Sequence, residues 1–196
     1  IIMGVRSKRY KSVKDLIEDS KSYSVKEAIT LIKKSKKLKF DETLDIAINL
    51  GVDPKHADQI VKGLVKLPHG TGKVVKIAVF AIDDKAKEAR EAGADFVGSE
   101  DLAKQLEKSE IKVDRVLATP DMMGIVGKLG KVLGPKGLMP NPKLGSVTTD
   151  LKKTIEDIKD GLIEFKADKA GTIHAGVGKI SFEEEKLEKN INNFVD

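Results

Sequence analysis

The chain has 196 residues, of which 40% are hydrophobic and 34% are charged, and 36 basic and 31 acidic side chains give a net charge of +5. This composition suits one large domain or two small ones. No apolar run is long enough to cross a membrane, cysteine is absent, and the three histidines lack metal-ligand spacing. We therefore expect a cytoplasmic protein without a metal or other cofactor.

The positive charge is concentrated at the amino end. Residues 1–39 carry 12 basic and 4 acidic side chains, a net charge of +8, whereas residues 40–196 sum to −3. Such clustering is typical of proteins that bind a polyanion, although a solvated lysine-rich surface would look the same. A second basic stretch lies between Asp121 and Asp150, where no acid occurs. Its lysines are Lys128, Lys131, Lys136 and Lys143.

The first segment predicts a basic arm, a helix and a strand. The arm carries Arg6, Lys8 and Arg9. Ser24 and Glu27 form a Ser-x-x-Glu capping box, which predicts a helix from about 24 to 37. The helix ends in further lysines, including Lys36, Lys37 and Lys39. These lysines would stabilise the negative end of the helix dipole, and they would equally attract an external phosphate. Apolar and polar residues then alternate over 43–50, as in a strand with one buried face.

Phe40 stands between this basic helix end and the strand. An aromatic ring beside lysines is suited to stacking on a nucleic-acid base, which contributes on the order of 1–3 kcal/mol. The alternative is that Phe40 fills the junction between helix and strand. Aromatic residues make up only 4% of the chain, so a broad single-strand platform is not expected, and folded RNA fits better.

From residue 68 the pattern changes to that of a parallel sheet with helices. The continuously apolar run 77–82 predicts a strand that is buried on both faces. Alternating helices and strands follow it, with further strands at 96–97 and 115–118. A glycine-rich and proline-rich loop over 134–145 and a helix near 150–159 complete this unit.

The final segment matches the opening one better than the middle one in its pattern of strands and helices. Residues 163–180 suit strands with a turn at 169–171, which we interpret as a hairpin. Lys166, Lys169 and Lys179 would extend its basic face. Apolar spacing in the last helix predicts that its buried residues are Leu187, Ile191, Phe194 and Val195.

The segments together predict a two-part architecture. Residues 1–67, a strand-poor opening, would combine with 161–196 into a split α+β domain. Residues 68–160 would form an inserted, Rossmann-like α/β domain. Three glycines would allow hinge motion at the joints, namely Gly70, Gly72 and Gly161.

The glycines give little support to an enzyme. No Gly-x-x-x-x-Gly-Lys-Ser/Thr segment and no Gly-x-Gly-x-x-Gly fingerprint in a strand–turn–helix context occurs. Residues 69–73 have the composition of a phosphate cradle, but their position favours a hinge. No serine stands near a histidine in the sequence, and no triad is indicated. A nucleotide-using α/β enzyme is the weaker second interpretation.

Four segments resemble the family of large-subunit ribosomal protein one in its bacterial form. They are Lys-Phe-Asp-Glu-Thr at 39–43, Asn-Leu-Gly-Val-Asp-Pro at 49–54, Leu-Pro-His-Gly-Thr-Gly-Lys at 67–73 and the Gly-Lys-Pro-rich stretch at 123–143. The resemblance spans nearly the whole chain, and the last stretch is highly specific. It implies a non-catalytic protein with a split RNA-binding domain and an inserted Rossmann-like domain.

The resemblance also implies partners. Members of that family bind large-subunit rRNA, form the mobile stalk beside the exit site and assist release of deacylated tRNA. They repress translation by binding the mRNA of their own operon. We expect a monomer away from the ribosome. By position, the implied RNA contacts are Lys39, Phe40, Thr43, Lys166, Lys169, Thr172 and His174, and the lysines of the insert would face tRNA or lie at the periphery.

The two ends of the chain depart from the family pattern. Family members continue beyond the last helix into strands that carry a Thr-Met-Gly-Pro motif, whereas this sequence stops at Asp196. We expect part of the RNA site to be absent for that reason. At the other end, Met3 is expected to be the start.

Overall fold

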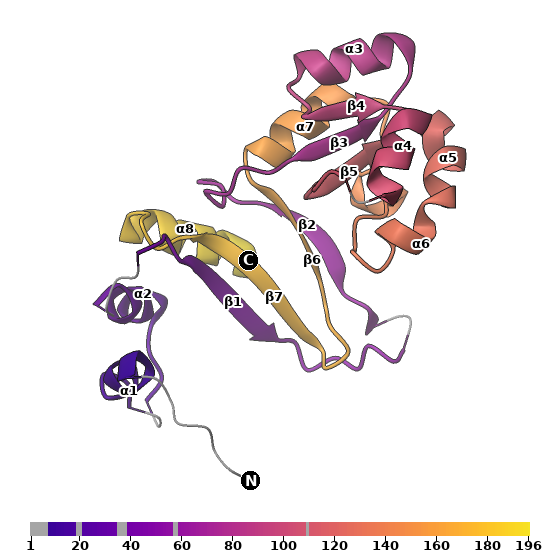
Figure 1. Ribbon diagram of the computed structural model, residues 1–196. Helices are drawn as coiled ribbons and strands as arrows, with labels where there is room; N and C mark the ends of the chain where they lie inside the picture. Colours follow the sequence, from indigo (N-terminus) through magenta and orange to yellow (C-terminus); the bar gives the residue numbers. More distant parts are fainter. Residues whose placement is uncertain (1–7, 19–20, 35–38, 57–58, 109) are drawn as a thin grey trace.

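The computed structural model describes residues 8–18, 21–34, 39–56, 59–108 and 110–196. Helices and strands fall into two groups (Figure 1). In the outer group, strands near the beginning of the chain pair with strands near its end. In the central group, three parallel strands that lie between residues 77 and 118 form a sheet. The mixed α/β content and the parallel sheet agree with the sequence prediction.

The outer group contains two antiparallel strand pairs. Its elements are α1 (Lys8–Lys14), α2 (Val25–Lys34), β1 (Thr43–Asn49), β2 (Lys62–Lys66), β6 (Leu162–Lys166), β7 (Thr172–Lys179) and α8 (Glu184–Val195). β1 pairs with β7, and β2 pairs with β6. The predicted strands and the turn at 169–171 are present, with one antiparallel bridge beside the turn, between Ala167 and Ile173. The predicted hairpin is wrong only in the rest of its pairing, because β6 pairs with β2 and β7 pairs with β1.

The strand β2 is absent from the sequence prediction, and the opening of the chain is less strand-poor than expected. β2 has only five residues and includes Gly63, which weakens the strand signal. Gly63 lies against the Phe165 ring, where an added Cβ would come within 2.9 Å of ring carbon Cζ. Its partner β6 lies almost a hundred residues away in the sequence, so no local pattern reveals the pair.

The capping box before α2 is present. The Ser24 N–H donates to the Glu27 carboxylate at 3.0 Å, and the Glu27 N–H donates to the Ser24 hydroxyl at 3.3 Å. The first of these hydrogen bonds is the main cause that lowers the pKa of Glu27. The described part of α2 ends at Lys34, so the predicted end near residue 37 lies outside the described residues.

α8 supplies much of the core of the outer group. Leu187, Ile191 and Phe194 are buried against the sheet, and the Phe194 ring meets that of Phe165 edge to face at 5.5 Å. The prediction for Val195 is wrong, because 62% of this residue is exposed. Consecutive residues in a helix point about 100° apart, so Phe194 and Val195 cannot both face the core at the last turn.

The central group is built on the sheet order β4–β3–β5, with all three strands parallel. Its elements are β3 (Ile77–Phe80), α3 (Asp83–Glu91), β4 (Phe96–Gly98), α4 (Glu100–Glu107), β5 (Arg115–Ala118), the 3-10 helix η2 (Pro120–Met122), α5 (Met123–Lys128), α6 (Gly130–Leu133), the 3-10 helix η3 (Pro142–Leu144) and α7 (Leu151–Lys159). Every residue of β3 is buried, as its continuous apolar run predicts.

Helices cover both faces of this sheet. α4, α5 and α6 pack on one face, in a cluster that includes Phe80, whereas α3 and α7 pack on the other, in a cluster that includes Val79. Alternate residues of β3 thus enter two separate apolar layers. The predicted layer of parallel strands with helices is confirmed.

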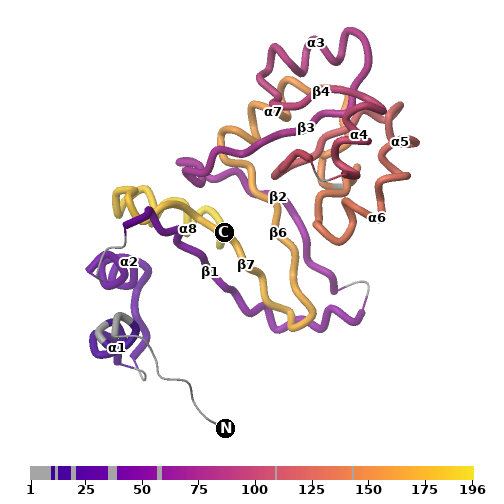
Figure 2. The backbone as a smooth tube through the Cα atoms, in the orientation of Figure 1, coloured from indigo at the N-terminus to yellow at the C-terminus, as the bar shows by residue number. Residues whose placement is uncertain are grey.

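The two chain segments that join the groups lie side by side (Figure 2). The Leu67 N–H donates to the Gly161 carbonyl at 3.0 Å. Gly161 has a φ of +112°, and a Cβ there would lie 2.5 Å from the Cα of Gly70. Gly70 and Gly72 also have positive φ, at +63° and +68°. A side chain would strain these joints.

Asn190 of α8 ties one joint to the core. Its side chain is fully buried. The amide donates to the carbonyls of Gly70 and Val177 at 2.9 and 2.8 Å, and its oxygen accepts the His69 N–H at 3.1 Å. One buried side chain thereby satisfies three backbone groups from two segments.

We predict that Asn190→Ala lowers the free energy of unfolding by about 2–3 kcal/mol, because it leaves backbone polar groups without partners. Urea unfolding measures the change. Asn192→Ala, at an exposed position of the same helix, is the matched control and should change stability by less than about 0.5 kcal/mol. Equal losses in both variants would contradict this role.

Candidate nucleic-acid interface

The β1–β7 sheet has one buried and one open face. Leu44, Ile46 and Ile48 point into the core, whereas the alternate residues of β1 are exposed. We call the open side, with its partners on β7, the sheet face. It consists of Thr43, Asp45, Ala47 and Asn49 with Lys179, Gly176, His174 and Thr172 opposite them.

A bulge brings the β7 residues onto this face. Between Leu44 and Asp45 the partners on β7 change from Gly178 to Gly176, so Val177 is an extra residue and is buried. Lys179 and His174 are five positions apart and would point to opposite sides of a regular strand. The extra residue places both on the sheet face. The Lys179 ammonium donates to the Thr43 hydroxyl there at 2.8 Å.

Phe40 precedes this face and lies mostly in solvent, with 67% of the residue exposed. Lys39 beside it is also exposed. The alternative interpretation, in which Phe40 fills the helix–strand junction, does not agree with this exposure. An aromatic ring that is exposed beside a lysine is available for a base to stack on.

The turn between β6 and β7 adds a second segment. The Asp168 carboxylate accepts the N–H groups of Ala170 and Thr172 at 2.8 and 3.0 Å. These hydrogen bonds lower the pKa of Asp168, first that from Thr172 and then that from Ala170. The His174 imidazole lies 3.6 Å from the same carboxylate. The turn is therefore a fixed platform and not a free loop.

This turn presents lysines to solvent. Lys166 and Lys169 are exposed on it. Lys62 of β2 lies directly opposite Lys166, and two like charges in that arrangement repel each other. Lys62 is not among the residues predicted from the sequence, because β2 is not predicted either, and only the strand pairing identifies this residue. A bound polyanion would relieve the repulsion.

The face is not purely basic. Asp45 is exposed at its centre, and a carboxylate there accepts hydrogen bonds from base amino groups or 2′-hydroxyls. The face therefore offers donors and acceptors together, which suits recognition of a folded RNA surface better than attraction by charge alone.

The structure leaves several predicted contacts apart from this site or outside its description. Arg6, Lys36 and Lys37 lie outside the described residues, as do the side chains of Lys8, Arg9 and Lys143. Lys128, Lys131 and Lys136 are exposed in the central group, not on the sheet face. At the end of α2, the Lys33 ammonium donates to the Phe182 carbonyl, so this lysine has a structural partner.

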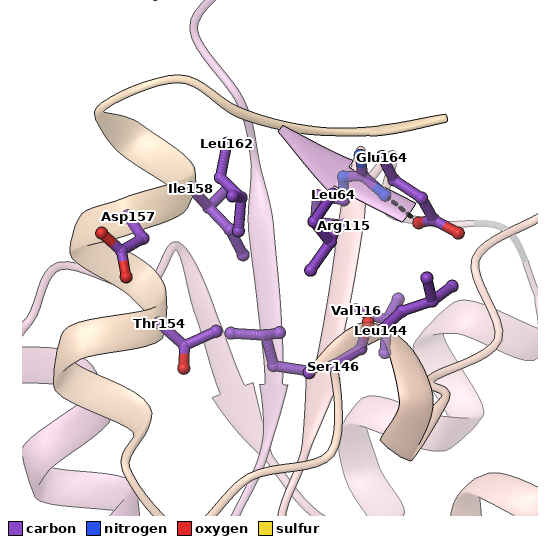
Figure 3. A pocket seen from close by; sticks show the side chains of 12 residues that line it. Leu64, Arg115, Val116, Leu144, Ser146, Thr154, Asp157, Ile158, Leu162 and Glu164 are labelled. Atoms are coloured by element: carbon purple, nitrogen blue, oxygen red, sulfur yellow. Dashed lines mark hydrogen bonds and ion pairs between the residues drawn. The ribbon is translucent and has the colours of Figure 1, made fainter. Parts of the chain in front are cut away.

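A cleft of ≈ 130 Å³ lies where the two groups meet, between the β2–β6 pair and the β5–α7 region (Figure 3). Arg115 and Glu164 form an ion pair across it, and Lys66 binds Asp157 at 2.7 Å. Leu64, Leu144 and Leu162 line much of the rest. These contacts join the groups and do not form a phosphate cradle.

The candidate nucleotide segments have structural roles instead. Gly124 and Gly127 lie within α5, where a strand-to-helix loop would be needed. The Lys73 ammonium pairs with Asp114. In the part of the chain that the structure describes, no group of three or more His, Asp or Glu side chains is placed to hold a metal ion. None of the described helices has the length and apolar character of a membrane span.

Comparison with known proteins decides the family. The profile of the ribosomal protein L1p/L10e family matches residues 31–196. Large ribosomal subunit protein uL1 of Myxococcus xanthus (strain DK1622) is 55% identical over 197 residues, which cover 99% of this chain and 83% of that protein. The chain belongs to the ribosomal protein L1p/L10e family. It is a ribosomal protein and not an enzyme, so the interpretation as a nucleotide-using enzyme is wrong.

The family match covers the whole sheet face, the turn and the central group, whereas α1 and the first part of α2 precede it. The resemblance stated from residues 39–43, 49–54, 67–73 and 123–143 is thus confirmed at the level of the family. Which of the residues contact RNA remains a prediction from their geometry.

We predict that Asp168→Asn removes part of the loss of folding stability that the wild-type protein shows as the pH falls. A carboxylate whose pKa is lowered by folding stabilises the protein above the ordinary carboxyl range, and this contribution is lost as the pH falls through the lowered pKa. Urea midpoints of wild type and variant should therefore differ most above the ordinary carboxyl range and converge as the pH falls below it. Asp84→Asn, an exposed aspartate in α3, is the control, and an equal effect there would contradict the prediction.

Proposed function

We propose that this protein binds the RNA of the large ribosomal subunit through the sheet face, Phe40 and the β6–β7 turn. Membership of the family makes it a ribosomal protein of the large subunit, located on the cytoplasmic ribosome. The observation that carries the proposal is the exposure of Phe40 and Lys39 immediately before an open sheet face. The family motif at 39–43 occupies this same position.

Each part of the proposed site has a separate role. The Phe40 ring would stack on an unpaired base, while Lys39 and Lys169 would neutralise phosphates. Thr43, Thr172 and His174 lie on the sheet face, where they would form hydrogen bonds with 2′-hydroxyls and base edges. Lys166 and Lys62 would extend the contact along the phosphate backbone of the RNA. With these roles, the affinity for RNA should depend on salt concentration, and binding should be specific for the shape of the RNA.

We predict that Phe40→Ala lowers affinity for a large-subunit rRNA fragment by about 5- to 100-fold, the loss of one stacked base. Its thermal midpoint should not change, because the side chain is largely in solvent. Filter binding at fixed salt measures the affinity. Val195→Ala removes an apolar side chain that is similarly exposed, at 62%, and should leave binding unchanged. Unfolding of Phe40→Ala, or unaltered affinity, would contradict the stacking role.

Salt titration separates the charged contacts from the stacked one. The slope of log affinity against log salt should become shallower by about one on Lys169→Ala and should not change on Phe40→Ala. Mononucleotide would not compete with the rRNA fragment. Affinity for rRNA that is independent of salt would contradict the proposal.

We further propose that the two groups are separate domains. Residues 68–160 would form an inserted domain, and 1–67 with 161–196 would form the RNA-binding domain. The buried clusters of the two groups support this division, because they share no buried residue, although Leu162 of β6 packs against the cluster that contains Val79. Gly70, Gly72 and Gly161 at the adjoining joints would form the hinge of a mobile stalk. The insert would then reach the exit site and assist release of deacylated tRNA.

The basic segment of the insert is the proposed contact with tRNA. We predict that replacing its lysines by glutamine slows release of deacylated tRNA from reconstituted ribosomes and leaves affinity for rRNA unchanged. The four positions are Lys128, Lys131, Lys136 and Lys143. Replacement of Lys152 and Lys153, exposed on α7 of the same group, is the control. If the fourfold variant lost affinity for rRNA, the proposal that these lysines contact tRNA would be contradicted.

The same sheet face would serve a second RNA. We propose that the free, monomeric protein binds the mRNA of its own operon there and represses its translation. Because the two RNAs would occupy one surface, rRNA would displace the mRNA, and Phe40→Ala would weaken both complexes.

A further inference from the structure

The chain immediately after β7 meets the chain immediately before β1. We call residues 180–183 the junction loop. The Asp41 carboxylate accepts the Ser181 N–H at 3.2 Å through one oxygen and the Ser181 hydroxyl at 2.6 Å through the other. The Ile180 N–H donates to the Glu42 carbonyl at 2.9 Å. Two oxygens of one carboxylate therefore hold one residue of the loop.

The junction loop is itself fixed from several sides. The backbone bond from Ile180 to Glu42 continues the ladder of the sheet by one step. The Phe182 N–H donates to the Lys179 carbonyl at 3.0 Å, and the Phe182 carbonyl accepts the Lys33 ammonium of α2. The Phe182 ring lies so close to Gly72 that a Cβ there would come within 2.9 Å of it. Contacts from several elements thus hold the junction loop in place, and it can support the residues of the chain that contact it.

Phe40 depends on this support because it makes little use of the core. With 67% of the residue exposed, packing does not determine where its ring points. Its neighbour Asp41 provides the attachment, through the two hydrogen bonds to Ser181. A side chain that is held in place before binding loses less conformational entropy when a base stacks on it.

We propose that Asp41 and Ser181 form a positioning clamp that holds Phe40 in place for RNA. This inference rests on the proposed function of the sheet face and adds residues that touch no RNA themselves. Both clamp residues are exposed, so their hydrogen bonds contribute little to global stability. The clamp therefore acts on the local order of residue 40 and, through it, on affinity.

The test is a double-mutant cycle with the full chain and a large-subunit rRNA fragment. Ser181→Ala should lower affinity about fivefold, the effect of one hydrogen bond, without changing the thermal midpoint. In the Phe40→Ala background the same substitution should have no further effect. Ser181→Thr keeps the hydroxyl and should restore affinity. Ser99→Ala, in the central group at a helix start without a side-chain cap, is the control.

Three outcomes would overturn the clamp. They are unchanged affinity in Ser181→Ala, equal losses with and without Phe40, and a loss that Ser181→Thr does not rescue. If Ser181→Ala unfolds, Asp41→Asn weakens the same contact from the other side, and the same cycle with Phe40→Ala decides.

A separate readout distinguishes failure of the clamp from failure of the proposed function. If the wild-type protein does not bind the rRNA fragment, the proposed function is wrong. The backbone order parameter of residue 40, measured by NMR in the free protein, still tests the clamp. It should fall in Ser181→Ala and not in Ser99→Ala, and an unchanged value would contradict the clamp.

Discussion

The pairing of strands from opposite ends of the chain is the constraint on which the rest of the structure depends. β1 pairs with β7, and β2 pairs with β6, across more than ninety intervening residues in each case. Such contacts carry a large loop-closure cost. The central group lowers this cost, because its folded structure brings Leu67 and Gly161 within one hydrogen bond of each other.

The same constraint explains which parts of the fold the sequence predicts. The parallel strands β3 and β5 follow from local runs of apolar residues, and the start of α2 follows from its capping box. The β2–β6 pair and the pairing of β7 with β1 depend on distant partners. Local periodicity favours a hairpin at the end of the chain, and the long-range pairing overrides it.

The candidate site is predictable as two segments and not as one surface. Lys39 and Phe40 are evident as a basic and aromatic segment, and Lys169 as part of a turn. No sequence pattern shows that the bulge at Val177 turns Lys179 and His174 to the same side. Lys33 belongs to a basic cluster that the sequence suggests for RNA binding, but its ammonium donates to the backbone carbonyl of Phe182. Charge patterns alone do not separate ligand contacts from structural ones.

The meeting of the two joints also bears on how such an architecture can arise. The chain enters the central group after Leu67 and leaves it at Gly161, and a Cβ at Gly161 would touch Gly70. Points of entry and exit that adjoin in this way are those at which a domain can be inserted into a pre-existing fold. A short turn in place of residues 71–160 would span the same gap. The two strand pairs of the outer group therefore place no requirement on the length of chain between residues 71 and 160.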